Sequence, residues 1–299
     1  MIYNKMFINL IKSLRPYHWV KNSFIFLPLF FAQRFGDLSA LLNCVIAFGG
    51  FSLVASSIYV INDINDIELD RQHPRKCRRP IASGVISIKQ GISLAVISFI
   101  LGMAITVFGV CNIILTGVVL VYYLLNLAYT LRLKRYAIID VMIIASGFVL
   151  RIMVGGIAAE VELSSWIILM TFLLAMFLGF AKRRDDVLIS QKDGIIARAN
   201  IVRYNVGFID SVLVMTAGIT IVAYIMYCMS PEVVERMRSD NLYISSIFVI
   251  TGIIRYLQHT MVYETSGNPT KMLIRDRFLQ LVILGWIATF IVIMYVDQL

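Results

Sequence analysis

The sequence predicts an all-α, polytopic membrane protein with nine transmembrane helices. Hydrophobic residues fill 59% of its 299 positions and charged residues only 15%, whereas soluble domains are about half apolar and about one quarter charged. A helix needs about 20 mostly apolar residues to cross a hydrocarbon core about 30 Å thick, and such segments recur along the whole chain. Basic residues concentrate in alternate gaps between these segments, which is typical of multi-pass membrane proteins.

The predicted elements follow from hydropathy along the chain. Residues at about 1–17 are predicted to form a short amphipathic helix on the membrane surface, because polar residues interrupt their apolar positions. The first span is short, and Lys21 and Asn22 are candidates for a position inside the helical bundle. The nine spans cover residues 22–35, 40–63, 90–109, 112–130, 138–159, 163–181, 208–229, 242–258 and 278–296.

The basic residues place the N-terminus in the cytoplasm. With nine spans, 23 of the 27 lysine and arginine residues fall in the N-terminal tail and in the gaps after even-numbered spans. Arg34, Arg236 and Arg238 lie in the opposite segments, and Arg151 lies within a span. This asymmetry obeys the positive-inside rule. It predicts one integral-membrane domain over 1–299, capped on the cytoplasmic side by loops at about 64–89, 131–137, 182–207 and 259–277.

Four acidic residues within eight positions interrupt the apolar pattern at the end of the second span. On a helix, offsets of three, four and seven residues share one face, so Asp63, Asp66 and Asp70 are predicted to project together while Glu68 points elsewhere. Crowded carboxylates at a membrane boundary need a partner, and Mg²⁺ accepts one or two carboxylates together with phosphate oxygens. This face is therefore a candidate Mg²⁺–diphosphate site; the alternative is a solvated helix end neutralised by nearby basic residues.

A basic segment, RQHPRKCRRP, follows the acidic stretch directly. Its prolines, Pro74 and Pro80, predict an extended loop. Guanidinium and ammonium groups match phosphate oxygens, so this loop suits the binding of a phosphorylated substrate beside the metal. The alternative is that the same residues only anchor a cytoplasmic loop.

The stretch NDINDIELDRQHPRKCRRPIASG at 62–84 resembles the NDxxDxxxD…RP(I/L)xxG signature of the UbiA superfamily of intramembrane prenyltransferases. Nine helices with a cytoplasmic N-terminus are also the architecture of that family. The resemblance implies a helical bundle around a central cavity, in a bacterial inner membrane, with its active site facing the cytoplasm. It also implies a Mg²⁺-bound diphosphate, held by Asn62, Asp63, Asp66 and Asp70.

Aromatic prenyltransferases of this superfamily carry a second motif, DxxxD, after the sixth helix. The corresponding stretch here is GFAKRRDDVLISQKDG, in which neither Asp185 nor Asp186 is followed by an aspartate four residues later. Lys182, Arg183 and Arg184 stand beside them, and such a cationic site is suited to binding a phosphate directly. The alternative is ordinary flanking charge at a cytoplasmic helix end.

Three further stretches, at 14–22, 129–156 and 268–290, resemble the polyprenyl-phosphate phosphoribosyltransferase branch of the superfamily. This resemblance implies transfer of 5-phosphoribose from phosphoribosyl pyrophosphate to a membrane polyprenyl phosphate, with release of pyrophosphate. The product would be a precursor of arabinofuranose-type pentoses for the cell envelope. No general base is required, because a phosphate monoester is already largely anionic at neutral pH; this suits a chain with three histidines.

The resemblance implies two groups of site residues. The catalytic group is Asp63, Asp66, Asp70 and Lys182. The substrate-binding group is Lys21, Asn22, Arg71, Lys76, Arg78, Arg79, Tyr129, Lys134 and Arg183.

Several alternatives stay open. The nearest is a UbiA-type aromatic prenyltransferase that uses a prenyl diphosphate in quinone or haem synthesis, against which the missing second aspartate motif argues. A transporter is disfavoured because nearly all ionisable residues gather at one face, and a nucleic-acid partner because the basic residues are dispersed over separate loops. Arg151 either forms a structural pair or reaches the substrate cavity. Asp140 either complements the helix dipole or has a separate role.

Overall fold

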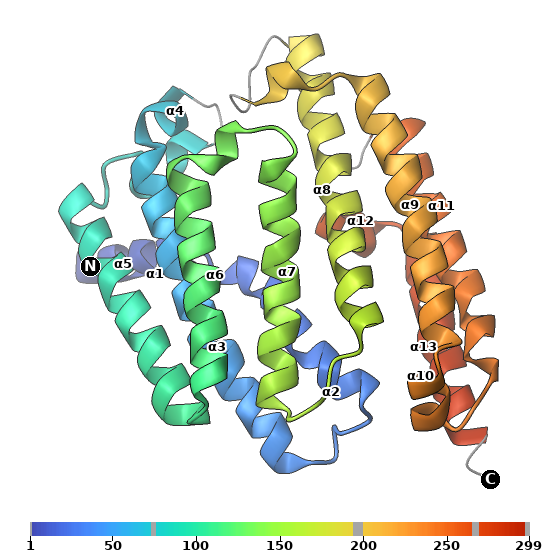
Figure 1. Cartoon of the computed structure of the whole chain (residues 1–299). Helices are drawn as coiled ribbons and strands as arrows, with labels where there is room; N and C mark the ends of the chain where they lie inside the picture. Colours follow the sequence, from blue (N-terminus) through green and yellow to red (C-terminus); the bar gives the residue numbers. More distant parts are fainter. Residues whose placement is uncertain (1, 73–75, 194–199, 265–268, 297–299) are drawn as a thin grey trace. The chain divides into compact units, whose positions relative to one another are not determined.

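The computed structural model describes residues 2–72, 76–193, 200–264 and 269–296. Within these ranges the regular structure is helical throughout and contains no strand (Figure 1). The predicted all-α class is therefore confirmed for the part of the chain that the structure describes.

Six of the described helices are long and apolar enough to cross a membrane, which makes the chain a multi-pass membrane protein. These spans are Leu38–Asn65 (α3), Ile88–Val110 (α5, Ile88–Ala104, continued by the π-helix η3, Ile105–Val110), Ile113–Leu131 (α6), Ile139–Ala158 (α7), Ser165–Lys192 within α8 (Ser165–Asp193) and Val206–Cys228 (α9).

The count of nine spans is not confirmed among the described residues. The predicted first span, 22–35, consists of the end of a 3₁₀ helix, η1 (Pro16–Phe26), and a five-residue helix, α2 (Leu27–Phe31). The predicted eighth span is shared between the short η6 (Asn241–Ser245) and α11 (Ser246–Met261), and the ninth is α13 (Arg277–Val296). Two short helices, α10 (Pro231–Met237) and α12 (Pro269–Arg275), complete this part of the chain.

The contacts divide the chain into two compact units. Unit 1 holds residues 1–134 and 147–163, and unit 2 holds residues 135–146 and 164–299, so α7 contributes to both. The single domain over 1–299 stays a prediction.

Unit 1 is organised around α3. A Cβ atom at Gly102 on α5 would lie 2.7 Å from the carbonyl oxygen of Gly50 on α3, so only glycine permits this close approach of the two backbones. Asp37 begins α3 by accepting hydrogen bonds from the backbone N–H groups of Ser39 and Ala40. The buried core of unit 1 consists of apolar residues of η1, α2, α3, α6 and α7.

The N-terminal helix α1 (Ile2–Leu14) occupies most of the segment predicted to be an amphipathic surface helix. Leu10 and Leu14 pack against a buried cluster that includes Val60 and Ile81. Phe7 and other apolar residues of α1 are exposed instead. The helix thus presents apolar side chains both to unit 1 and to its surroundings, as a helix at a membrane interface requires.

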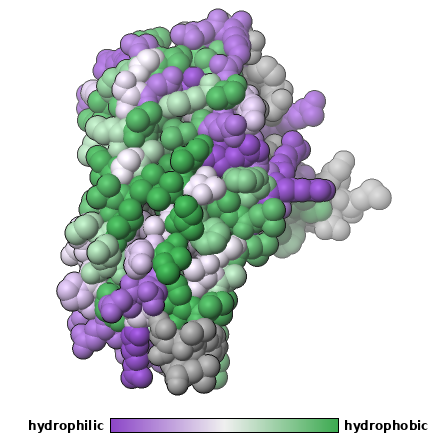
Figure 2. Space-filling view, turned by 90° about the vertical axis from the view of Figure 1, so that its right-hand side faces the viewer, coloured by the Kyte–Doolittle hydropathy of each residue, from purple (hydrophilic) through white to green (hydrophobic). Residues whose placement is uncertain are grey.

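Unit 2 is built from the start of α7 and from α8 to α13, with η5 (Ile201–Arg203) between α8 and α9. Its core includes Phe177 and Phe180 of α8, Ile209 and Leu213 of α9, and Tyr256 of α11. Large hydrophobic side chains also cover much of its exterior in Figure 2, as expected of a surface in contact with lipid. The exposed large hydrophobic residues of α9 and α13 include Val214, Met215, Val222, Leu281, Leu284 and Val292.

Two predicted cytoplasmic loops contain more helix than expected. The helix α8 continues to Asp193, so the first part of the predicted loop 182–207 is helical. Lysine and arginine favour helix, and Arg183 pairs with Asp186 one turn later. The predicted loop 64–89 likewise contains α4 (Ile67–Gln72) and the 3₁₀ helix η2 (Lys76–Arg78). The extended conformation predicted for RQHPRKCRRP at 71–80 is therefore wrong for Arg71, Gln72 and Lys76–Arg78, while Pro74 lies outside the described residues.

Candidate functional site

The acidic motif lies where α3 gives way to α4. Asp63 belongs to the last turn of α3, which ends at Asn65. Asp66 follows as its C-cap residue, and its N–H donates to the carbonyl oxygen of Asn62 (3.0 Å). Asp70 lies in α4, and its N–H donates to the carbonyl oxygen of Asp66 (2.8 Å). The backbone therefore bends at Asp66, while these two hydrogen bonds still join α3 to α4.

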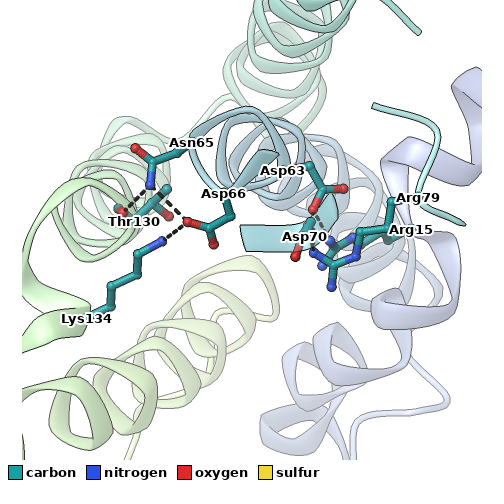
Figure 3. A network of polar contacts seen from close by, with 8 residues as sticks. All are labelled: Arg15, Asp63, Asn65, Asp66, Asp70, Arg79, Thr130 and Lys134. Atoms are coloured by element: carbon teal, nitrogen blue, oxygen red, sulfur yellow. Dashed lines mark hydrogen bonds and ion pairs between the residues drawn. The ribbon is translucent and has the colours of Figure 1, made fainter. Parts of the chain in front are cut away.

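Asp63 and Asp70 converge on one arginine. The Nη1 atom of Arg79 lies 3.0 Å from Asp63 Oδ1 and 2.5 Å from Asp70 Oδ2 (Figure 3). Arg15, which enters from the segment after α1, forms a second ion pair with Asp63. Both aspartate side chains are only 3% exposed. Two carboxylates that are this deeply buried need the cations to offset their desolvation.

The Asp66 side chain points away from Asp63 and Asp70 (Figure 3). Its Oδ1 atom accepts hydrogen bonds from Lys134 Nζ (2.6 Å) and from the side-chain amide of Asn65 (3.1 Å). In Figure 3 Asp66 points toward Lys134, whereas Asp63 and Asp70 point toward Arg15 and Arg79. The prediction that the three aspartates share one face is therefore corrected, because the helix ends at Asp66 and the spacing of a continuous helix no longer applies.

The residues at this motif suit a divalent cation without forming a finished site. Among the described residues, no group of three or more His, Cys, Asp or Glu side chains is placed to hold a metal ion. However, the oxygens of Asp63 and Asp70 already meet at one positively charged nitrogen. Carboxylate oxygens are the ligands that Mg²⁺ prefers. The donor set thus fits Mg²⁺, and a guanidinium group holds the position between the two carboxylates.

Five other predicted substrate-binding residues differ in their surroundings. Arg71 donates through Nε to the carbonyl oxygen of Ala82 (3.1 Å), and its side chain is 55% exposed. Arg78 is exposed as well. Lys21, Lys76 and Tyr129 are half-buried. All of them belong to unit 1, together with the acidic motif.

Asn22 and Arg151 form a buried network of their own. Arg151 donates to Asn22 Oδ1 (2.8 Å), to the carbonyl oxygen of Gly147 (2.6 Å) and to Tyr122 Oη (3.0 Å). Three aromatic rings surround its guanidinium group, with centroids at 4.9 to 5.2 Å, and Asn22 also donates to Ser52 Oγ (2.9 Å). Of the two interpretations of Arg151, these contacts favour the structural one. The same contacts show that Asn22, a predicted substrate contact, accepts a hydrogen bond from Arg151.

The basic stretch on α8 lies in unit 2 and is divided between the surface and the interior. Lys182 is exposed, whereas Arg183 is only 1% exposed and donates through Nε to Asp140 Oδ2 (2.6 Å). Arg183 also reaches Asp186 (3.1 Å), and Asp140 accepts a hydrogen bond from Tyr204 Oη (3.1 Å). Asp140 thus has a role beyond the helix dipole, and the burial of Arg183 does not favour its predicted contact with substrate.

Arg15 is the residue that the sequence analysis missed. It is 91% buried with its backbone in the left-handed region (φ 52°), and its guanidinium group also lies 5.7 Å from the centroid of the Tyr59 ring. The available signal was an arginine directly before Pro16 in the stretch 14–22. Nothing in that signal indicated a partner 48 positions away.

Comparison with known proteins assigns the chain to a family. A family model described as the UbiA prenyltransferase family matches residues 23–294. The chain is 31% identical to a decaprenyl-phosphate phosphoribosyltransferase from Mycolicibacterium smegmatis, covering 94% of this chain and 90% of the relative. It is 30% identical to a protein of the same name from Corynebacterium glutamicum, covering 96% of this chain and 87% of the relative.

Solved structures share the fold. A UbiA homologue from Archaeoglobus fulgidus bound to GPP and Mg²⁺ superimposes with a TM-score of 0.71 at 17% identity, covering 96% of this chain and 99% of that chain. A digeranylgeranylglyceryl phosphate synthase gives a TM-score of 0.68 at 18% identity, covering 99% of this chain and 100% of that chain.

Proposed function

Because the chain belongs to the UbiA prenyltransferase family, we propose that it is a polyprenyl-phosphate phosphoribosyltransferase. Its donor is phosphoribosyl pyrophosphate and its acceptor is the phosphate of a membrane polyprenyl phosphate. The observation that carries this proposal is the similarity, at 29% to 31% identity over 93% to 96% of the chain, to relatives named decaprenyl-phosphate phosphoribosyltransferase.

The basic stretch of α8 also favours phosphoribosyl transfer over aromatic prenyl transfer. An enzyme that holds a prenyl diphosphate through a second metal site would need carboxylates there, as the missing DxxxD motif would supply. In this chain Asp186 contacts Arg183, whose guanidinium group also binds Asp140. Asp186 of this stretch thus helps to neutralise a buried arginine, and Lys182 offers an exposed positive charge for a phosphate.

The proposed reaction exchanges one bond at the anomeric carbon of ribose. An oxygen of the acceptor phosphate forms a bond to this carbon, while the carbon–oxygen bond to the diphosphate breaks and pyrophosphate leaves with the bonding electrons. Mg²⁺ supplies charge stabilisation for the departing pyrophosphate. The residues proposed to hold it are Asn62, Asp63, Asp66 and Asp70.

The remaining proposed site residues bind and orient the phosphates. Arginine forks and lysine ammonium groups are suited to this because the substrates carry their negative charge on phosphate oxygens. The donor contacts are Arg71, Lys76, Arg78 and Arg79. Lys21, Lys134 and Lys182 are proposed to bind either the acceptor phosphate or the donor diphosphate. Tyr129 is proposed to donate to a phosphate or to the ribose. Asn22 and Arg183 are proposed to act through their buried networks.

The membrane arrangement of the proposal follows the positive charges of the sequence. We place the N-terminus and the active site on the cytoplasmic side of a bacterial inner membrane, with nine spans around a central cavity. The apolar surroundings of that cavity would exclude water from the positively charged sugar carbon. The product would serve as a lipid-linked pentose precursor for the cell envelope.

A transfer assay tests this proposal. The purified chain in detergent is given labelled phosphoribosyl pyrophosphate, polyprenyl phosphate and Mg²⁺, and label in the lipid phase is counted. Asp66→Asn should lower the rate by about 10² or more, because transition-state charge stabilisation is a large catalytic contribution. Glu68→Gln is the matched control, since this neighbouring carboxylate is 87% exposed and should leave most of the activity. Equal rates in the two variants would contradict the proposed site.

A further inference from the structure

Each aspartate of the acidic motif is neutralised by a basic side chain of unit 1. Arg15 and Arg79 hold Asp63, Arg79 also holds Asp70, and Lys134 holds Asp66. Among the described residues, the three carboxylates are therefore paired with three basic side chains. The place between Asp63 and Asp70, which suits a divalent cation, is taken by a guanidinium group.

Arg15 is held in this position by a network of its own. Its φ angle of 52° lies in the left-handed region, which side chains other than glycine adopt rarely. The neighbouring Leu14 accepts a hydrogen bond from Ser56 Oγ (2.8 Å), and Ser56 accepts another from Trp19 Nε1 (2.9 Å). These bonds tie the chain on both sides of Arg15 to α3. Such an unfavourable conformation persists where its surroundings fix it, which points to a role for the residue.

We propose that Arg15 and Arg79 are exchangeable counterions of the acidic motif. In the structure they neutralise Asp63 and Asp70. When Mg²⁺ arrives with the diphosphate of the donor, the metal takes their place at the carboxylates and the two guanidinium groups bind the phosphate oxygens. The inference rests on the proposed function to the extent that a diphosphate is the partner, and it makes Arg15 a further phosphate-binding residue.

Charge balance predicts that the metal and the diphosphate bind together. A divalent cation that entered alone would have to displace a bound arginine and would leave the cluster with excess positive charge in a poorly hydrated place. A diphosphate brings the negative charge that both the metal and the displaced arginines need. Metal and diphosphate are therefore expected to bind together, each weakly without the other.

The exposure of the two arginines distinguishes their contributions. The side chain of Arg79 is 27% exposed and bridges two carboxylates, whereas that of Arg15 is 11% exposed and contacts Asp63. Arg79 has the freer path to solvent and to an incoming phosphate. Its removal should therefore change metal binding more than the removal of Arg15.

The first measurement is the binding of Mn²⁺ alone to the purified full-length chain, followed by the EPR signal of free Mn²⁺. Removing a competing cation should make Arg79→Gln bind Mn²⁺ about tenfold more tightly than the parent, and Arg15→Gln should shift it in the same direction. The matched control is Arg34→Gln, which removes the Arg34–Asp37 ion pair near the other end of α3 and should leave the affinity unchanged.

The second measurement is equilibrium dialysis of labelled inorganic pyrophosphate at a fixed Mn²⁺ concentration. The expected change in affinity is opposite to that for Mn²⁺. Arg79→Gln and Arg15→Gln should bind pyrophosphate about tenfold more weakly, because each loses a charge-assisted phosphate contact. Arg79→Lys and Arg15→Lys, which keep the charge and thus the fold-stabilising pair, should lie between parent and Gln variants in both measurements.

Tighter Mn²⁺ binding together with weaker pyrophosphate binding is expected only if the arginines exchange between the carboxylates and the phosphates. If the Gln variants bind Mn²⁺ no more tightly than the parent, the arginines do not compete with metal and the exchange is refuted. If they bind Mn²⁺ more tightly but pyrophosphate equally well, the arginines do not move to the phosphates and the proposal fails as well. Neither probe contains ribose or lipid, so failure of the phosphoribosyl assignment leaves both results interpretable.

Discussion

Arg183 Nε lies 2.6 Å from Asp140 Oδ2, and both side chains are almost wholly excluded from solvent, at 1% and 0% exposure. Removing Asp140 takes from the buried Arg183 the closer of the two carboxylates that contact it, the other being Asp186 at 3.1 Å. Asp140→Ala should therefore reduce the free energy of unfolding by about 3–5 kcal/mol, measured by denaturant unfolding in detergent. The double variant Asp140→Ala with Arg183→Met should be less destabilised than the sum of the two single variants.

A solvent-exposed ion pair of unit 2 provides the control for this prediction. Lys192 and Glu264 pair at 2.7 Å with side chains 65% and 37% exposed. Since exposed pairs contribute about 0–1 kcal/mol, Lys192→Ala should change the free energy of unfolding little. A comparable loss from Lys192→Ala and Asp140→Ala would contradict the structural role assigned to Asp140.

Tyr204 couples this buried pair to pH. Burial is the main reason why the pKa of its phenol rises to about 12. The folded chain therefore keeps this proton between about pH 10 and 12, where the unfolded chain, with a pKa near 10, loses it. The stabilisation is fully present below pH 10 and is lost as the pH rises through 12.

Tyr204→Phe tests both consequences. At pH 7 the variant should be less stable by about 1 kcal/mol, because it loses the hydrogen bonds with Asp140 and with the N–H of Ile138. Between pH 10 and 12 its free energy of unfolding should fall less steeply than that of the parent. Parallel curves over that interval would show that Tyr204 does not carry this pH dependence.

Arg151 is expected to stabilise unit 1 without contacting substrate. Arg151→Lys removes the planar fork that serves Asn22, Gly147 and Tyr122, and lysine cannot reproduce that geometry. The variant should lose about 2 kcal/mol of stability, the scale of hydrogen bonds to charged groups, while the KM for the donor stays unchanged. The exposed Arg132→Lys serves as the control. A raised KM with unchanged stability would favour the substrate-cavity interpretation.

Lys134 is expected to contribute to donor binding through its position at Asp66. Lys134→Met removes the ammonium group 2.6 Å from the Asp66 carboxylate, so the KM for phosphoribosyl pyrophosphate should rise about tenfold, the loss of one charge-assisted contact. Steady-state kinetics in the transfer assay measures this. The control is Lys89→Met, an exposed lysine near the start of α5, and an equal effect of the two substitutions would exclude a specific role for Lys134.

Hydropathy and charge predicted the helical class, because a membrane helix must satisfy its backbone hydrogen bonds within one segment. They do not predict the continuation of α8 through Lys182–Asp193, because a run of charges is typical of the end of a membrane span. The reason lies 43 positions away, where Asp140 neutralises Arg183 inside the unit. Pairings between such distant residues leave no periodic signal in a single sequence.

The candidate site was predicted in its residue types more than in its geometry. The spacing of Asp63, Asp66 and Asp70 indicated one shared face, but the bend at Asp66 gives that residue a separate partner, Lys134. Helix periodicity can report a face only as far as the helix continues. The predicted metal and substrate roles of these residues stay predictions, as do the cytoplasmic orientation and the nine spans.

The central claim, transfer of phosphoribose to a lipid phosphate, is tested most directly by the identity of the lipid product. The purified chain would be offered two complete substrate pairs together with Mg²⁺: phosphoribosyl pyrophosphate with polyprenyl phosphate, and a prenyl diphosphate with an aromatic acid. Mass spectrometry of the lipid fraction should show polyprenyl phosphate enlarged by one phosphoribosyl group, with one pyrophosphate released per product. A prenylated aromatic acid in its place would contradict the account and assign the chain to aromatic prenyl transfer.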